Sequence, residues 1–489
     1  MMRMADRRSD KPPTTDELEQ QLRAVLEAND TPAWVKALLS LVMLLLDDLR
    51  AENERLRAKL YGSTSERTRT PRAPKVTEPR RAVRGTTSKQ ASLDVATIDV
   101  PFRQTACPCC GGTDLVDCGI ERTEQIDRIP EAVIRREIRR AKKLCRGCET
   151  ISTAPQPRIC GTGSDYGPGL HAHVLVSKCL DSMPLHRQAR QYERLGVPIA
   201  RSTLGDIFSR SATMLEPLYE LIRERIRNEP YINADETPMA IQAPKRHVRG
   251  YVWVFGSSEH ILYDFSPSRS GETPSRLLGG TTGYLQVDGY TGYNEVTTPN
   301  GRTRVACLAH VRRKFVEATP TEPERAGWVV ELIGEIYRHE AEAREAGIRG
   351  TPEHARIRQE RIRPMMECLE RWLREQTDIR PKSPLGKAIA YARKQWPALI
   401  RPLDDPSLAL DNNEAERRLR LVAMGRNNFV CVGSREAGHR LAIAQTMTTM
   451  CSLHGVNPTE WLTDVLQRIS TTPATDMASL LPQNWAPLG

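Results

Sequence analysis

Strand-forming segments follow one another from residue 231 to about residue 318, and this block limits the possible folds more than any other feature. The segments are YINADETPMAIQ, GYVWVFG, HILYDFSPS, GYLQVDGY and TRVACLAH, rich in β-branched and aromatic residues. FVCVGS predicts one more strand further along the chain. Helical patterns lie on both sides of the block and continue from about residue 324 to 398. We therefore predict a multidomain α/β protein with its core at residues 230–440 and a helical insertion at about 320–400.

The length and charge of the chain narrow its partners. A chain of 489 residues is too long for one compact core, so several domains are expected. The net charge of +10 favours a polyanionic partner, nucleic acid first, although a merely soluble basic protein would carry the same excess. The longest apolar run, Leu38 to Leu46, is far shorter than the roughly 20 residues of a membrane span. The start, MMRMADRRSD, lacks a signal-peptide core, so we expect a cytoplasmic protein without a membrane partner and with reduced thiols.

Residues 1–63 contain one long predicted helix, WVKALLSLVMLLLDDLRAENERLRAKL. Its apolar residues alternate at spacings of three and four over about three heptads, as in the seam of a coiled coil. Asn53 takes an a position, where a lone Asn can fix the register of a parallel dimer. The alternative is an amphipathic helix that packs on its own domain. Residues 64–92 are rich in Pro, Ser, Thr and Arg, so we predict a flexible basic linker there.

Two C-x-x-C pairs lie in residues 93–160, CPCC at 107–110 and CRGC at 145–148. Four thiolates with no open position suit a structural Zn²⁺ site, and the predicted ligands are Cys107, Cys110, Cys145 and Cys148. The intervening stretch of about 34 residues contains EAVIRREIRRAKKL, which predicts a strand or hairpin as in a zinc ribbon. Cys109 could replace a neighbouring ligand, and the alternative is four unrelated buried cysteines.

Residues 161–229 have helical patterns interrupted by a short Gly-Val-Pro break. PLHRQARQYERLGVPIARSTLGDIFSR predicts one helix before the break and a second after it, capped by Ser202 or Thr203. This arrangement is typical of a helix-turn-helix that binds DNA, although such pairs also occur as plain packing. At the other end, residues 441–489 carry Trp461 and Trp485 and are predicted to pack back on the core.

Three acidic residues stand out by their sequence context. Asp235 is predicted at the end of an apolar strand before a Pro-marked turn, Asp288 at the end of another strand, and Glu416 on a helix. Such carboxylates can converge on divalent metals, and hard oxygen ligands suit Mg²⁺ or Mn²⁺. Two such ions stabilise the attacking and leaving oxygens of a phosphoryl displacement. The pattern alone leaves other acids open, namely Asp264, Asp411 and Glu414.

Longer motifs occur in an order that resembles a known family. They are LYGSTSER, CPCCGG with CRGC, MPLHRQARQYERLGVPIARSTL, ADETP, YVWVFG, LQVDGYTGYN, CLAHVRRKF and DNNEAERRLRLVAMGRNNFVCVGS, and they span about residues 50 to 440. NPTEWLTDVL in the tail also matches. On these motifs the chain resembles the DDE transposases of the insertion sequence 66 family. The resemblance implies an RNase H-like catalytic core with a helical insertion, preceded by an N-terminal helix, a zinc-binding module and a helical DNA-binding region.

The same resemblance implies a function and maps the three DDE acids onto Asp235, Asp288 and Glu416. A DNA transposase of this kind cleaves DNA at the ends of a mobile element with Mg²⁺ or Mn²⁺ and joins the freed 3′-hydroxyl to target DNA. Its expected partners are double-stranded DNA, further copies of the chain in at least a dimer, and accessory proteins of the same element. It would work in the bacterial cytoplasm at the nucleoid.

Cationic residues follow these acids, and we predict that they hold DNA phosphates. They are His310, Arg312, Arg313 and Lys314 after Asp288, and Arg417, Arg418, Arg420 and Arg426 after Glu416. The alternative is that they pair with acids of the chain itself, and His310 could equally be a core histidine. The chain departs from the family at Asn427, where Lys is frequent, so a phosphate contact there would be weaker.

Three other functions stay open at the level of sequence. The chain could be a DNA-binding protein derived from a transposase with an inactive core, an RNase H-fold nuclease that cuts without joining, or a structural oligomer. The last would leave the basic charge and the acidic pattern unexplained. The sequence contains no Walker A motif, GxxxxGK[ST], which argues against an ATP-driven motor.

Overall fold

The computed structural model describes residue 133 and residues 142–144, 151–153, 166–244 and 246–487. The predicted coiled coil, the basic linker and all four predicted zinc ligands lie outside these residues. Two short strands, β1 (Lys142–Leu144) and β2 (Ile151–Thr153), pair antiparallel around the second C-x-x-C pair. The strand expected between the two cysteine pairs is therefore present as β1.

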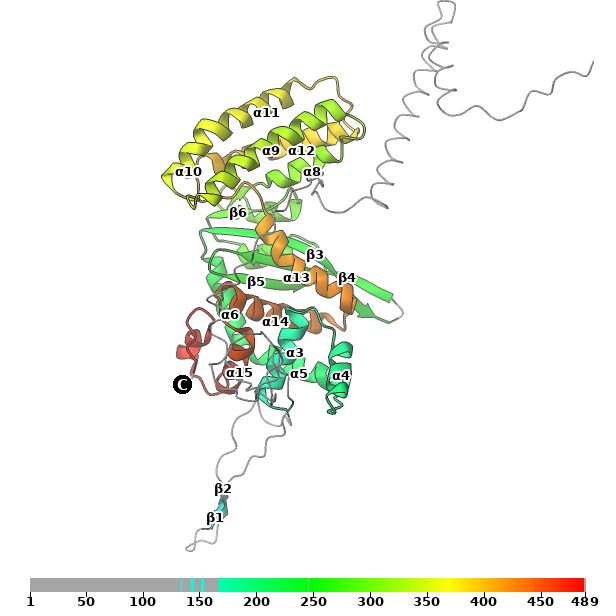
Figure 1. Ribbon diagram of the computed structural model, residues 1–489, viewed down its shortest axis with the longest axis vertical. Helices are drawn as coiled ribbons and strands as arrows, with labels where there is room; N and C mark the ends of the chain where they lie inside the picture. The colour runs from blue at the N-terminus through cyan, green and yellow to red at the C-terminus, as the bar shows by residue number, and fades with distance from the viewer. Residues whose placement is uncertain (1–132, 134–141, 145–150, 154–165, 245, 488–489) are drawn as a thin grey trace, which may run out of the picture. The chain divides into compact units, whose positions relative to one another are not determined.

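A mixed sheet forms the centre of the described chain (Figure 1). Its first three strands, β3 (Tyr231–Ala243), β4 (Arg246–Gly256) and β5 (Ile261–Ser266), pair antiparallel in sequence order. On the other side of β3, β6 (Tyr284–Gln286) and then β7 (Thr303–Val305) run parallel to it. The short β8 (Cys431–Val432) also pairs with β3, further along. The predicted mixture of strands and helices is confirmed.

One detail of the prediction for β3 is wrong. Asp235 was expected at a strand end before a turn marked by Pro238, but the strand continues through both residues to Ala243. Proline lacks an N–H group and is tolerated where a strand edge is open. Pairing with β6 stops at Asn233 and pairing with β8 begins at Ala240, so Pro238 lies at such an opening among the described strands.

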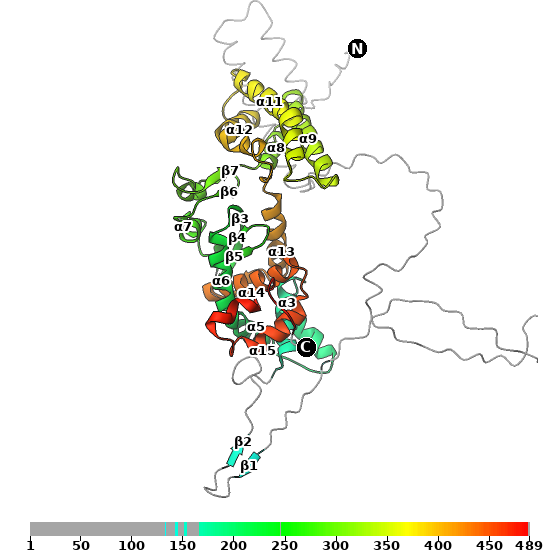
Figure 2. The same cartoon turned by 90° about the vertical axis from the view of Figure 1, so that its left-hand side faces the viewer.

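Helices from both ends of the described chain share one hydrophobic core with the sheet. They are α3 (Pro168–Cys179), α4 (Leu185–Arg194), α5 (Arg201–Met214), α6 (Glu216–Arg227), α14 (Arg435–Leu453) and α15 (Pro458–Arg468). Helix α14 packs on β5, and α15 packs on α3 (Figure 2). The indole of Trp461 is fully buried and donates to the carbonyl of Leu480, so the tail packs on the core as predicted.

The two helices around the Gly-Val-Pro break are present as α4 and α5, which contact each other. The predicted cap is wrong, because α5 begins at Arg201 after Ala200 and no side chain caps it. Ser202 and Thr203 lie inside its first turn. A short 3₁₀ helix, η4 (Ala474–Leu480), follows α15, and α7 (Glu272–Leu278) and η1 (Thr291–Val296) lie between strands of the sheet.

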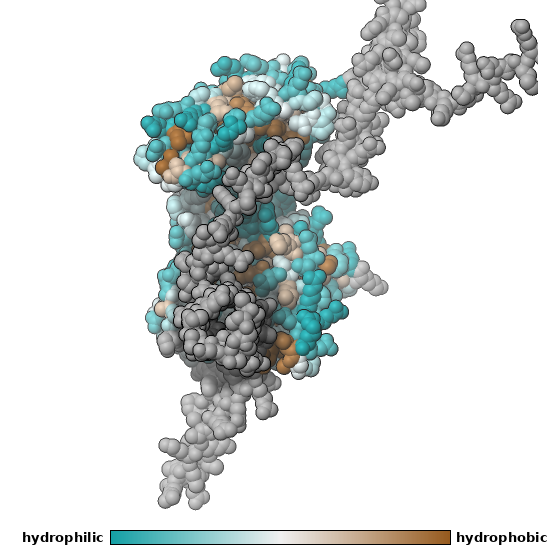
Figure 3. Space-filling view, in the orientation of Figure 1, coloured by the Kyte–Doolittle hydropathy of each residue, from teal (hydrophilic) through white to brown (hydrophobic). Residues whose placement is uncertain are grey.

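A second hydrophobic core belongs to the helices that follow β7. They are α8 (Leu308–Val316), α9 (Pro323–Glu345), α10 (Pro352–Ile357), the π-helical turn η2 (Arg358–Ile362), α11 (Arg363–Glu375) and α12 (Pro384–Leu399). On the face shown in Figure 3 their outer surface is mostly hydrophilic, as expected when the apolar side chains gather inside. The short helix η3 (Arg401–Leu403) then leads back toward the sheet.

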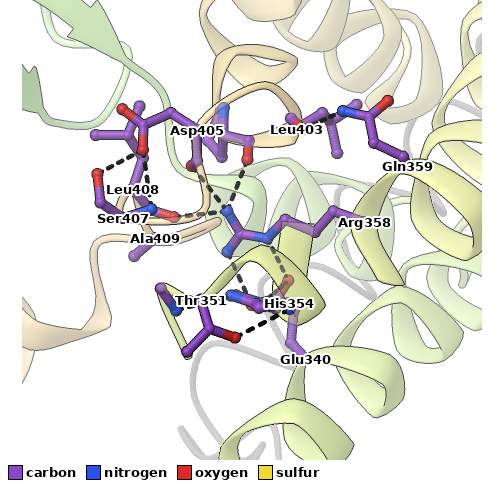
Figure 4. A network of polar contacts seen from close by, with 12 residues as sticks. Glu340, Thr351, His354, Arg358, Gln359, Leu403, Asp405, Ser407, Leu408 and Ala409 are labelled. Atoms are coloured by element: carbon purple, nitrogen blue, oxygen red, sulfur yellow. Dashed lines mark hydrogen bonds and ion pairs between the residues drawn. The ribbon is translucent and has the colours of Figure 1, made fainter. Parts of the chain in front are cut away.

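A buried polar network fixes this return segment (Figure 4). Arg358 donates to both carboxylate oxygens of Glu340, at 2.7 and 2.9 Å. Its remaining nitrogen donates to three backbone carbonyls, those of Pro402, Asp405 and Leu408. Because these carbonyls precede α13 (Asn413–Phe429), the network connects the helical insertion to the helix that carries Glu416.

None of the helices in the described ranges is both long enough and apolar enough to cross a lipid bilayer.

Candidate functional site

The parallel pairing of β3 and β6 brings Asp235 and Asp288 to the same end of the sheet. The last paired residues are Asn233 and Gln286, and each acid lies two residues further along its own chain. Since side chains alternate along a strand, each acid continues the face occupied by its paired neighbour. The charge of Asp288 also raises the pKa of Asp235, so the two carboxylates lie near each other, although they are 53 positions apart in sequence.

The opening between β6 and β8 surrounds the first of these acids. On this edge of β3, residues 234–239 have no strand neighbour among the described residues. Burial, then the charge of Glu236, and then the charges of Asp288 and Glu416 raise the pKa of Asp235 to about 8. The backbone N–H of Glu236 donates to its Oδ1 at 2.9 Å and opposes this shift. An acid with such a pKa needs either a proton or a nearby cation at neutral pH.

Helix α13 packs on the face of β3 that carries Asp235. Arg418 donates to Asn233 Oδ1 at 2.9 Å, and Arg426 donates to Thr237 Oγ1 at 3.1 Å. Asn233, Asp235 and Thr237 alternate along the strand, so they lie on one face. Glu416, in the first turn of α13, therefore lies on the same side of the sheet as Asp235.

The prediction that Arg418 contacts a DNA phosphate is wrong. Its side chain is buried and also donates to the carbonyl of Ser257 at 2.8 Å. It thus ties α13 to the sheet. Arg426 also contacts β3, because one of its nitrogens donates to Thr237 Oγ1 and to the carbonyl of Pro238. Arg420 is exposed.

Helix α8 supplies two basic residues beside Glu416. Arg313 lies 3.5 Å from Glu416 Oε2, and His310 Nδ1 lies 3.7 Å from Oε1. Neither Oε1 nor His310 Nδ1 has a hydrogen-bond partner among the described residues, and both atoms are buried. Burial, and then the charge of Arg313, lower the pKa of His310. The ring is therefore neutral at neutral pH, and Glu416 keeps one oxygen available for a ligand.

The loop after β6 holds Asp288 against the helical insertion. Tyr290 N donates to Asp288 Oδ1 at 2.9 Å, and Gly289 N donates to the hydroxyl of Tyr391 on α12 at 3.1 Å. A Cβ atom at Gly289 would lie 2.5 Å from the Tyr391 ring, so a side chain does not fit there. The close approach of α12 thus depends on glycine beside the acid.

A second acidic group, which sequence reasoning missed, lies on the opposite face of β3. Glu236 is buried, pairs with Arg269 at 2.6 Å, and accepts from Tyr293 Oη at 2.7 Å. Burial raises its pKa despite both partners, and Asp288 adds to the rise. Strand alternation places Glu236 and Asp235 on opposite faces, and that was the available signal in the sequence.

Two of the rival acids have cationic partners of their own: Asp264 pairs with Arg276, and Glu414 pairs with Arg417. The third, Asp411, accepts from the backbone of Asn413 at 3.0 Å, and burial and then the charge of Glu416 raise its pKa, so it lies near the candidate acids. Lys314 lies 3.6 Å from Glu317, the residue after α8. Arg313, Lys314 and Arg417 thus each lie within ion-pair distance of an acid of the chain.

The three predicted acids share an electrostatic environment without forming a closed cage. Among the described residues, no group of three or more His, Cys, Asp or Glu side chains is arranged so that it could hold a metal ion as it stands. The donor set nevertheless consists of carboxylate oxygens, and Glu416 contributes a buried oxygen without a hydrogen bond. The chemistry of the residues present therefore fits Mg²⁺ or Mn²⁺.

Comparisons with known proteins identify the family of the chain. Residues 163–440 match the family described as Transposase IS66 family, and residues 447–483 match the IS66 C-terminal element. Residues 104–149 match the zinc-finger binding domain of transposase IS66, and this range contains both C-x-x-C pairs. The chain belongs to the IS66 family of transposases.

Similar proteins occur in Sinorhizobium fredii. Uncharacterized protein y4jD is 34% identical over 402 residues, which cover 78% of each chain. Uncharacterized protein y4hP is 32% identical over 406 residues, covering 78% of this chain and 73% of the relative. Uncharacterized protein y4qI is 29% identical over 399 residues.

Proposed function

We propose that this chain cuts DNA at the ends of a mobile element and joins them to target DNA, with Asp235, Asp288 and Glu416 as its catalytic acids. The observation that carries the proposal is the register of the sheet and of α13: Asp235 and Asp288 each follow the last paired residue of β3 and β6 by two positions, and α13 covers that face of β3 with Glu416 in its first turn. Burial, then Glu236, and then Asp288 and Glu416 raise the pKa of Asp235 to about 8. Acids from two parallel strands and one helix repel one another across a small space. Such an arrangement is costly to the fold and is typical of functional sites.

The sheet supports an RNase H-like assignment for the core. Three antiparallel strands are followed by two strands that are parallel to the first, in the spatial order β5-β4-β3-β6-β7. The acids lie on the central strand and its parallel neighbour, at the opening where β6 ends. We propose that the DNA phosphate binds at this opening, on the face of the sheet that α13 covers.

Divalent cations would be held by the carboxylates of Asp235, Asp288 and Glu416, with Mg²⁺ or Mn²⁺ as the occupant. When bound, such ions neutralise charge on the phosphate and on the attacking and leaving oxygens. Loss of its proton prepares Asp235 for this role. His310 Nδ1 lies 3.7 Å from one oxygen of Glu416, while Arg313 pairs with its other oxygen. Tyr290 N and the Gly289–Tyr391 contact hold the Asp288 loop.

The DNA-binding parts of the proposal are distributed along the chain. His310, Arg312, Arg313 and Lys314 on α8, with Arg417, Arg420 and Arg426 on α13, are proposed to lie along the DNA backbone near the scissile phosphate. The α4–α5 pair is proposed as a helix-turn-helix reader of the element's end. Cys107, Cys110, Cys145 and Cys148 are proposed to hold structural zinc in the matched zinc-finger domain. At least two copies would act together to hold two DNA ends, with accessory proteins of the element at the bacterial nucleoid.

The test compares two neighbouring glutamates on α13. Glu416→Gln should abolish nicking of a duplex that carries the element's end in Mg²⁺ or Mn²⁺, while DNA affinity stays within about twofold. Glu414→Gln, the matched control from the same turn, should cleave like the wild type, because the Glu414 carboxylate pairs with Arg417 and Arg418 and not with the candidate acids. Asp288→Asn should behave like Glu416→Gln. Cleavage at the wild-type rate by either of those variants would overturn the assignment.

The products of the same reaction separate the remaining alternatives. Joined molecules support a transposase, whereas cleavage without joining would indicate a nuclease. Binding without metal-dependent cleavage by the wild-type chain would indicate a DNA-binding protein with an inactive core. Either of these two results would overturn the proposed function.

A further inference from the structure

The β3–β4 hairpin extends beyond the rest of the sheet. Its ladder runs from the Asn233–Gly256 pair to the Ala243–Arg246 pair. On one side, β5 pairs with β4 only as far as Tyr251, and on the other, β8 pairs with β3 only at Ala240 and Ile241. Among the described strands, the Gln242–His247 and Ala243–Arg246 rows therefore have no third strand beside them, and β4 has no outer neighbour before Tyr251. Figure 1 shows this end of the hairpin, the ribbon of residues 242–249, projecting past α13.

This ribbon is strongly basic. Arg246, His247 and Arg249 are all exposed. No Asp or Glu occurs from Thr237 to Ser258, so the ribbon carries no acid of its own. No ion pair within the described part of the chain involves Arg246 or Arg249. The charge of the ribbon is thus not neutralised by an acid of the described residues.

The cations occupy both faces of the ribbon. In the ladder Arg246 lies opposite Ala243 and His247 opposite Gln242, and Arg249 lies opposite Ala240. Side chains alternate along a strand, so Arg246 lies on one face while His247 and Arg249 lie on the other. Between them Val248 exposes 39% of its surface on the same face as Arg246. A flat acidic surface would contact one face, whereas this distribution fits a partner with negative charge on two sides.

A groove of double-stranded DNA has this property. The major groove is about 12 Å wide, admits a two-stranded β-ribbon, and is bordered by phosphates on both walls. With the ribbon edge-on in the groove, Arg246 and Val248 would face one wall and Arg249 would face the other. Acidic proteins offer no comparable two-walled channel of regular charge.

We propose that the ribbon of residues 242–249 enters a groove of the DNA on which the candidate site acts. The inference rests on the proposed function, because it names a DNA contact of the same enzyme. Asp235 and Ala243 lie on the same strand, eight residues apart, which at about 3.3 Å per residue is roughly 26 Å. At about 3.4 Å per base pair this corresponds to roughly eight base pairs. The ribbon therefore contacts DNA within about one helical turn of the scissile phosphate.

The first experiment measures the salt dependence of DNA binding. The variant Arg246→Thr/Arg249→Thr removes two cations and keeps residues that favour strands. Its log–log plot of affinity against salt should be shallower than that of the wild type by about 1.8, the expected loss for two phosphate contacts. The matched control is Arg338→Thr/Arg356→Thr, whose side chains are each 65% exposed on the helical insertion. The control should keep the wild-type slope.

The second experiment locates the contact. A photo-crosslinking phenylalanine analogue at position 248 should attach to a duplex carrying the element's end, within about one helical turn of the cleavage point. An unchanged salt slope, or crosslinks confined to more distant positions, would overturn the proposal. The charges of the ribbon would then serve to prevent edge-to-edge pairing between molecules. If the Arg246→Thr/Arg249→Thr variant has a shallower salt slope but the wild type never cleaves DNA, the DNA contact of the ribbon is supported and the proposed function is overturned. The two failures are therefore distinguishable.

Discussion

Replacing Arg358 with Met should destabilise the helical insertion by about 3–5 kcal/mol, the usual cost of removing one partner from a buried ion pair. The Arg358 side chain is 1% exposed and donates to five acceptors. Its loss leaves Glu340 buried with His354, which lies 3.1 Å away, as its remaining side-chain partner among these contacts. Gly350 N donates to His354 Nδ1, so this neutral ring carries its proton on Nε2 and donates to Glu340.

The pH dependence of this variant follows from Glu340. Burial alone would raise its pKa, but the Arg358 hydrogen bonds and charge outweigh burial and lower it. Because the pKa of Glu340 is lower in the folded than in the unfolded chain, the Glu340–Arg358 pair stabilises the wild type fully at a pH above the unfolded-state pKa. This contribution is lost as the pH falls through the folded-state pKa of Glu340. The wild-type advantage over Arg358→Met should therefore shrink in acid.

Denaturant unfolding and hydrogen exchange of α9–α12 would measure the effect. The control is Arg356→Met, two residues earlier, whose exposed side chain should contribute less than about 0.5 kcal/mol. The double variant Arg358→Met/Glu340→Met should recover much of the loss, because apolar replacement of a whole buried pair is often nearly neutral. A loss below about 1 kcal/mol in the single variant, or additive losses in the double variant, would refute this account.

Three further outcomes are expected. Asp235→Asn should weaken a fall in stability with rising pH. The raised pKa of about 8 keeps a proton on the folded carboxyl that the unfolded chain loses near pH 4. Thermal melts in chelator from pH 5 to 9 should therefore fall less steeply with pH for the variant than for the wild type, and equal slopes would contradict the raised pKa. Gly289→Ala should cost about 1–3 kcal/mol by overpacking against Tyr391, and an unchanged Tm would contradict the contact. Zinc removal, or Cys145→Ser, should make residues 104–149 sensitive to protease while the melting of the sheet domain stays unchanged; equal sensitivity with and without zinc would argue against the four-cysteine site.

The sequence predicted the elements of this fold better than their contacts. Alternation and apolar content were enough to find the strands and α13, because these signals are local. Pro238 was misread as a turn because the opening between β6 and β8 depends on residues distant in sequence. Local pattern contained no information about that opening.

The candidate site shows the same division. Asp235 and Asp288 were selected from strand context, and the parallel register of β3 and β6 makes them neighbours. The exposed Arg420 and the buried Arg418 look alike in sequence, since only the orientation of α13 on the sheet separates them. Glu236 was passed over because its partners, Arg269 and Tyr293, come from later segments.

The packing of α15 on α3 has a consequence for synthesis of the protein. These helices lie near opposite ends of the described chain, and the hydrophobic core they share also includes the sheet. A ribosome must therefore finish almost the whole polypeptide before α3 meets its partner. Contacts of such long range form slowly. The core around the sheet would thus be completed only after synthesis ends. A chain truncated before α15 would lack the partner of α3 in this core.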